Sequence, residues 1–120
     1  MICDTGHNVG GWEYLSKQIA AQPCRQLRIV FGMVDDKDIG TVMKMLPKDA
    51  VFYWTQASTK RAIPAVRVAD LGRLLQLRGH IYNNVETAYR AALHDAGKED
   101  FIFVGGSSYV VSDLLESLDF

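Results

Sequence analysis

With 120 residues, the chain fits a single domain, and its 48% apolar content suffices for one hydrophobic core without disulfides or metal. Thirteen basic residues against fourteen acidic ones give a net charge of -1, which argues against a surface dedicated to nucleic acid or an anionic membrane. Cys3 and Cys24 lack Cys-x-x-Cys or zinc-ligand spacing, so free thiols and a reducing, cytoplasmic location are expected. The sequence contains neither an apolar stretch long enough to span a membrane nor an opening signal peptide.

Short apolar runs alternate with segments of helical periodicity in the first half of the chain. Residues 1–3 are predicted to end a strand, and residues 9–22 to form the helix after it. A second strand is predicted at residues 26–31, which are mostly apolar and are followed by glycine. Residues 39–46 have apolar side chains at the spacing of a helix that lies on a sheet. Residues 50–55, rich in aromatic and branched side chains, are predicted to form a third strand.

The second half of the chain continues the alternation with three predicted helices. One begins at Pro64 and ends at Gly79. Asn83 and Glu86 resemble a capping box at the start of the next helix, and the last helix follows the loop at residues 105–109. The apolar residues expected to face inward on the three helices are Val66, Leu71, Leu74 and Leu75, then Val85, Ala88, Tyr89, Ala92 and Leu93, then Val111, Leu114, Leu115 and Leu118.

Residues 101–104 form a continuous apolar run, as expected of a strand buried on both faces. Together with the preceding strands and helices, this run predicts an α/β fold, in which a mostly parallel sheet is connected by right-handed crossovers and flanked by helices on both faces. Ligands of such sheets bind beyond the carboxyl ends of the strands. Three loops are expected to share that edge, at residues 4–11, 32–38 and 105–109.

The segment D-T-G-H-N at residues 4–8 stands where a strand ends and a helix begins, and two interpretations are open. In the first, Asp4 accepts hydrogen bonds from a ribose and His7 donates to a phosphate, near the free N–H groups of the helix start. In the second, Asp4 and Asn8 only cap the turn, and His7 is a solvated loop residue. Taken alone, the segment favours the second interpretation, because caps are common.

The other polar loops are ambiguous when each is taken alone. Residues 35–38, three aspartates and one lysine, could hold a metal or a phosphate but fit a helix cap better. Residues 105–109 fit a tight turn with a serine cap, and they do not form a nucleophile elbow because Tyr109 replaces its last glycine. A hydrolase that uses Ser107 is therefore disfavoured.

In combination, four segments resemble motifs of the folylpolyglutamate synthase and dihydrofolate synthase family, in the right order and spacing. This family belongs to the Mur ligase superfamily. Residues 4–8 resemble its D-G-A-H-N-P motif, and residues 31–38 (F-G-M-V-D-D-K-D) resemble its F-G-x-x-x-D-K-D segment. Arg61-Ala62 is similar to an Arg-Ala pair of the family, and residues 105–115 resemble its closing T-G-S-L-Y-L-V-G-E-V-L.

The resemblance implies a Rossmann-like C-terminal domain of an ATP-dependent ligase. The full enzyme would phosphorylate the carboxylate of dihydropteroate or of a folate's terminal glutamate, and the amine of L-glutamate would attack the acyl phosphate to form an amide. ATP and Mg would be held mainly by an N-terminal ATPase domain of the same polypeptide, over which this domain closes. By motif position, Asp4 would lie near the ribose and His7, the candidate catalytic residue, near the phosphates, while Asn8 would only cap.

Departures from the family pattern limit these implications. Gly6 and Val9 replace the family's Ala and Pro, but neither change removes a polar side chain. The chain has no P-loop sequence, so residues 1–120 are expected to be one Mur ligase C-terminal (glutamate ligase) domain without its ATPase domain, and inactive alone. The alternative is a stand-alone α/β module that binds a nucleotide or a protein partner. The acceptor preference and the oligomeric state stay open. So does any ligand role of Ser107, Tyr109, Lys37 and Arg61.

Overall fold

The computed structural model describes most of the chain from residue 26 onward and a short strand before it. The described residues are 2–3, 26–34, 39–60, 62–98, 100–105 and 108–117, with the backbone alone at 2, 3, 39, 108, 109 and 117. The helix predicted at residues 9–22 lies outside them. Within the described residues, no helix is long and apolar enough to cross a membrane.

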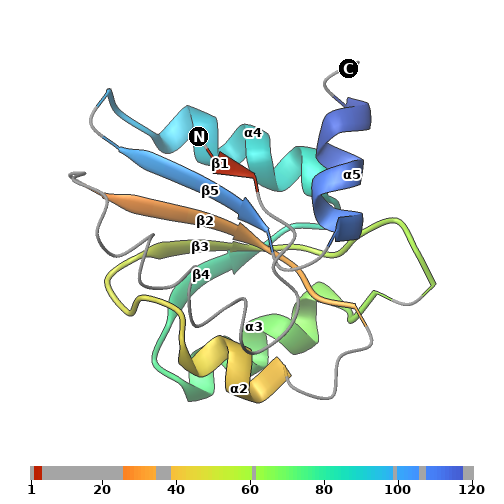
Figure 1. Ribbon diagram of the computed structural model, residues 1–120. Coiled ribbons are helices and arrows are strands. Elements are labelled where there is room, and N and C mark those ends of the chain that lie inside the picture. The colour runs from red at the N-terminus through yellow and green to blue at the C-terminus, as the bar shows by residue number, and fades with distance from the viewer. Residues whose placement is uncertain are drawn as a thin grey trace.

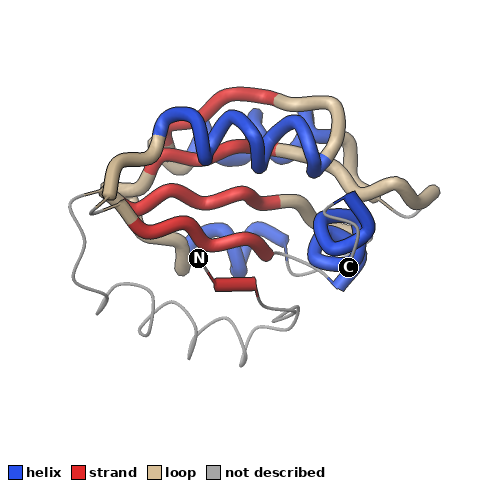
Figure 2. The backbone as a smooth tube through the Cα atoms, turned by 90° about the horizontal axis from the view of Figure 1, so that it is seen from above, coloured by secondary structure: helices blue, strands red, loops and turns tan. Residues whose placement is uncertain are grey.

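A parallel sheet of five strands forms the centre of the fold (Figure 1). Its strands are β1 (Ile2–Cys3), β2 (Leu27–Phe31), β3 (Val51–Trp54), β4 (Arg78–Ile81) and β5 (Phe101–Gly105). They lie side by side in the order β1-β5-β2-β3-β4, and every neighbouring pair is parallel (Figure 2). The last strand in the sequence therefore lies between β1 and β2.

Helices cover both faces of the sheet, which confirms the predicted α/β fold (Figure 1). The helices α2 (Ile39–Lys44) and α3 (Ala65–Leu74) lie on one face. The helices α4 (Val85–Asp95) and α5 (Ser108–Ser117) lie on the other. Each follows a strand, and α2, α3 and α4 return the chain to the amino end of the next one, as parallel pairing requires.

Alternating side chains of the strands form two apolar layers. Phe31, Phe52 and Trp54 point toward α2 and α3, where the rings of Phe52 and Trp54 stack with centroids 4.6 Å apart. Val30 and Val104 point the other way, toward α4 and α5. Because both faces are covered, the inner strands β2, β3 and β5 are mostly apolar rather than alternating with polar residues, as is usual in parallel sheets, whereas β4 is exposed.

The inward face of α3 differs in part from the prediction, although Leu71 and Leu75 pack against the core as expected. Its buried residues are small (Ala65, Val68, Ala69 and Gly72), whereas Val66 and Leu74 are 57% and 80% exposed. The indole ring of Trp54 lies so close that a Cβ built on Gly72 would be 2.5 Å from it. This ring fills the space that larger α3 side chains would otherwise occupy.

The ends of two helices were also predicted wrongly. The helix α3 ends at Leu74 instead of Gly79, because Gln76 takes a left-handed conformation (φ 64°) and Leu77 N–H donates to the Gly72 carbonyl at 2.8 Å. Gly79 is part of β4.

The helix α4 is capped by Asn84, whose side chain accepts from Thr87 N–H at 2.8 Å, so the predicted capping box of Asn83 and Glu86 is wrong. Glu86 instead accepts from Arg90. Leu93 of α4 and Leu115 of α5, both predicted to face inward, are exposed.

Candidate functional site

The carboxyl ends of the strands meet at one edge of the sheet. Phe31, the last residue of β2, pairs with Trp54 of β3 and with Gly105 of β5. Cys3 pairs with Val104, and Trp54 pairs with Ile81. The strands that precede the three loops predicted to carry function therefore end side by side, which confirms the topological prediction.

The predicted ligand-binding residues themselves lie outside the described part of the chain. This is true of Asp4 and His7. It is also true of Asn8, for which only a capping role is predicted, and of Lys37, Arg61 and Ser107, whose ligand roles stay open. Tyr109 is described by its backbone alone, in the first turn of α5. The nucleotide-binding role of Asp4 and the catalytic role of His7 stay predictions.

The chain leaves β2 through a narrow gap that requires glycine. A Cβ built on Gly32 would be 2.8 Å from the carbonyl oxygen of Thr55 and 3.1 Å from a methyl carbon of Val110. Gly32 N–H donates to the Gly105 carbonyl at 3.3 Å, and Thr55 N–H donates to the Phe31 carbonyl at 2.9 Å. The segment after β2 is therefore bounded by the end of β3 on one side and by the first turn of α5 on the other.

The loop between β3 and α3 is hydrogen-bonded to α5 and to the segment that follows β2. On one side, Ser58 donates two hydrogen bonds to the carboxylate of Asp113 on α5, at 2.6 Å from its N–H and 2.8 Å from its hydroxyl. On the other side, Ile63 N–H donates to the Met33 carbonyl at 2.9 Å, and an antiparallel bridge joins Ala62 to Val34. The loop thus links α5 to the segment that follows β2.

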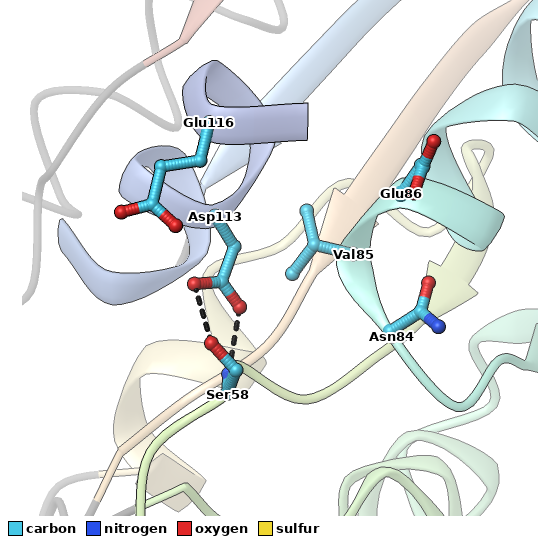
Figure 3. A pocket seen from close by; sticks show the side chains of 6 residues that line it. All are labelled: Ser58, Asn84, Val85, Glu86, Asp113 and Glu116. Carbon is cyan, nitrogen blue, oxygen red and sulfur yellow. Dashed lines mark hydrogen bonds between the residues drawn. The ribbon is translucent and has the colours of Figure 1, made fainter. Parts of the chain in front are cut away.

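A pocket of about 310 Å³ opens beside this loop at the same edge (Figure 3). Its lining residues are Ser58, Asn84, Val85, Glu86, Asp113 and Glu116. Three carboxylates surround this space, so it disfavours a phosphate. No group of three or more His, Cys, Asp or Glu side chains among the described residues is arranged to hold a metal ion. This pocket therefore does not suit a phosphate, and the described residues present no metal-binding group.

Sequence reasoning did not single out Ser58 or Asp113. Asp113 lies inside the segment that resembles the family's closing motif, and Ser58 lies in the polar loop after the third strand. The two residues are 55 positions apart, and the order of the strands brings them together. Local spacing carries no signal for such a pair.

A second polar cluster lies at the opposite edge, near the amino ends of β2 and β5. Arg28 donates to Asp100 at 3.0 Å and to the hydroxyl of Tyr53 at 2.9 Å, and that hydroxyl donates to Asp95 at 2.9 Å. Burial raises the pKa of Tyr53 to about 12, while the hydrogen bond from Tyr53 lowers the pKa of Asp95. This cluster ties β2, β3 and the end of α4 together, away from the carboxyl edge.

The sequence matches the family model described as "Mur ligase, glutamate ligase domain" over residues 1–108. The chain belongs to this family. Two curated relatives carry the name dihydrofolate synthase/folylpolyglutamate synthase. The Escherichia coli protein is 33% identical over 122 residues, and the Buchnera aphidicola (Schizaphis graminum) protein is 31% identical over 121. Each alignment covers 99% of this chain and 28% of the relative, so the chain spans little more than a quarter of their length.

Solved structures of such enzymes have the same fold. Escherichia coli FolC in complex with DHPP and ADP superimposes with a TM-score of 0.85 at 29% identity, over 97% of this chain and 28% of that one. The Yersinia pestis bifunctional folylpolyglutamate synthase/dihydrofolate synthase, complexed with AMPPNP and Mn, gives 0.84 at 28% identity, over 98% and 28%. The resemblance inferred from the four sequence motifs is confirmed.

Proposed function

We propose that this domain works as the C-terminal part of an ATP-dependent ligase that joins L-glutamate to dihydropteroate or to a folylpolyglutamate. The carboxylate of the acceptor would be activated as an acyl phosphate, and the glutamate amine would displace the phosphate. The observation that carries the proposal is the match of nearly the whole chain, in sequence and in fold, to enzymes named for these two activities. A related bifunctional synthase was solved with Mn, AMPPNP and L-glutamate bound, which supports ATP, a divalent metal and glutamate as ligands.

The work of the ligase would be divided between two domains. Because the chain has no P-loop sequence, an N-terminal ATPase domain of the same polypeptide would hold ATP, Mg and most of the folate contacts. The metal would neutralise charge on the transferred phosphoryl group. Asp4 would contact the ribose and His7 the phosphates, from the loop that follows β1. The isolated chain would have no ligase activity, and the enzyme would be cytoplasmic.

The assay is glutamate-dependent ADP release by the full-length ligase that contains this domain, with dihydropteroate or tetrahydrofolate as acceptor. We expect turnover by the wild type and a loss of about tenfold or more in His7→Ala, equal to about 1.4 kcal/mol of transition-state stabilisation. Equal rates in mutant and wild type would remove His7 from the mechanism but leave the ligase function standing. Absence of stimulation by any acceptor would favour a stand-alone binding module for a nucleotide or a protein.

A further inference from the structure

Asp113 and Ser58 form a link across the carboxyl edge of the sheet, which we call the clasp (Figure 3). The N–H of Ser58 donates to Oδ2 of Asp113 and its hydroxyl donates to Oδ1, so both carboxylate oxygens are engaged. Hydrogen bonds to a charged acceptor are stronger than neutral ones, and a two-point contact also fixes orientation. The clasp therefore fixes the loop after β3 relative to α5 in both distance and angle.

The clasp spans the exit of β2. In the sheet, β2 lies between β5 and β3, and the clasp joins the helix that follows β5 to the loop that follows β3. Directly at this exit, Gly32 is enclosed by Thr55 from the end of β3 and Val110 from the start of α5. The clasp and this enclosure involve the same two elements, so a movement of α5 away from the loop would open the gap around Gly32.

The segments held in this way are the ones whose sequences resemble ligase motifs. Gly32 belongs to the F-G-M-V-D-D-K-D segment, Asp113 belongs to the closing motif, and the loop that carries Ser58 leads to the Arg61-Ala62 pair. Ser58 and Asp113 neither belong to a metal group nor line a space suited to phosphate. What their geometry provides is the relative placement of three segments at the edge where ligands of parallel sheets bind.

We propose that Ser58 and Asp113 are positioning residues for the ligase reaction, which keep the segments after β2, β3 and β5 in register at the substrate edge. The inference rests on the proposed function. Reacting groups must be held within about 0.5 Å of their productive geometry, and small displacements of supporting segments reduce turnover. The clasp acts on the bound substrates through these segments and does not contact the substrates.

The test compares four single variants of the full-length ligase and the double variant Ser58→Ala/Asp113→Asn. Ser58→Ala removes one donor, and Asp113→Asn replaces one accepting carboxylate oxygen by an amide NH2 group, which donates and cannot accept. Ser58→Thr keeps both donors and should restore function. Glu116→Gln is the matched control, because Glu116 lines the same pocket from the same helix and forms no hydrogen bond with another described residue. The readouts are KM for glutamate and for ATP, kcat per folded enzyme, the melting temperature and hydrogen exchange of the Ser58 amide.

We expect kcat/KM for glutamate to fall about three- to tenfold in Ser58→Ala and Asp113→Asn, mainly through kcat, because displaced segments hold the reacting groups less well in their productive geometry. The double variant should lose no more than the worse single one, and Ser58→Thr and Glu116→Gln should stay within about twofold of wild type. Exchange of the Ser58 amide should accelerate in Asp113→Asn.

Two outcomes would overturn the inference, and they differ from failure of the proposed function. If kcat and KM per folded enzyme are unchanged while the melting temperature falls, the clasp only stabilises the domain. If Glu116→Gln loses as much kcat/KM as Asp113→Asn, the loss of activity is due to the charge of the pocket and not to the clasp. If the wild-type ligase shows no glutamate-dependent ADP release, the proposed function fails and the inference fails with it.

Discussion

Replacing Gly32 by alanine should destabilise the domain through a steric conflict at the exit of β2. The added methyl carbon would lie 2.8 Å from the Thr55 carbonyl oxygen and 3.1 Å from Val110. The nearer atom belongs to the backbone of a strand end that is hydrogen-bonded to Phe31, so it cannot rotate away as a flexible side chain could. Overpacking of this kind costs about 1–3 kcal/mol.

The measurement is urea unfolding of the purified 120-residue chain, together with its melting temperature. A cost of about 1–3 kcal/mol corresponds to a fall of roughly 4–12 °C for a domain of this size. Gly40→Ala is the control, because a Cβ at Gly40, in α2, would meet nothing within 4 Å. Alanine is also the better helix former, so Gly40→Ala should be neutral or stabilising by up to about 1 kcal/mol.

Comparing the stabilities of Gly32→Ala and Gly40→Ala distinguishes a local steric conflict from a general effect of replacing glycine. A Gly32→Ala variant as stable as the wild type would show that β3 and α5 can separate at little cost, which would refute the close packing described for this edge. If both variants lost stability equally, the loss would reflect glycine replacement in general and not the position of Gly32.

Two further predictions concern the core and the cluster at the amino ends of the strands. Gly72→Ala should cost about 1–3 kcal/mol in urea unfolding, because its Cβ would lie 2.5 Å from the ring of Trp54, and a loss no larger than that of Gly97→Ala would contradict this reason. Tyr53→Phe should cost about 1–3 kcal/mol at neutral pH, since Arg28 and Asp95 lose their shared partner. Because the folded pKa of Tyr53 is raised to about 12 from an ordinary value near 10, its contribution is complete below about pH 10 and is lost as the pH rises toward 12. Stability measured across that range should fall more steeply in wild type than in Tyr53→Phe, and equal slopes would exclude the linkage.

The inner strands were predictable because a strand that is buried on both faces has a run of apolar residues in the sequence. A strand of a covered parallel sheet is mostly apolar, and residues 27–31, 51–54 and 101–105 have that pattern between polar loops apart from Arg28, whereas the exposed strand β4 does not. Their common edge followed from the alternation of strands with helices, which restricts the connections to parallel crossovers. Fold class and the location of the ligand edge therefore needed no tertiary information.

The inward face of α4 was largely predicted, since Val85, Ala88, Tyr89 and Ala92 are buried, but that of α3 was predicted only in part because it depends on the partner across the interface. The periodicity of α3 allows more than one apolar face, and the ring of Trp54 selects the small one that contains Gly72. Likewise, adjacent asparagines offered two caps for α4, and the backbone geometry selects Asn84. The clasp of Ser58 and Asp113 required the strand order, since neither residue has a local signal.

The position of β5 has a consequence for how the sheet is assembled. Among the described residues, β1 pairs with β5 alone, so the first strand joins the sheet through one of the last segments of the chain, with Ile2 opposite Phe103. Pairing of residues this far apart in sequence requires closure of a long loop, and such non-local contacts slow folding. The strands β2, β3 and β4 can pair during synthesis, whereas β1 must wait until β5 has emerged. The loop after β1, with Asp4 and His7, thus begins at a strand that can join the sheet only after β5 has been synthesised.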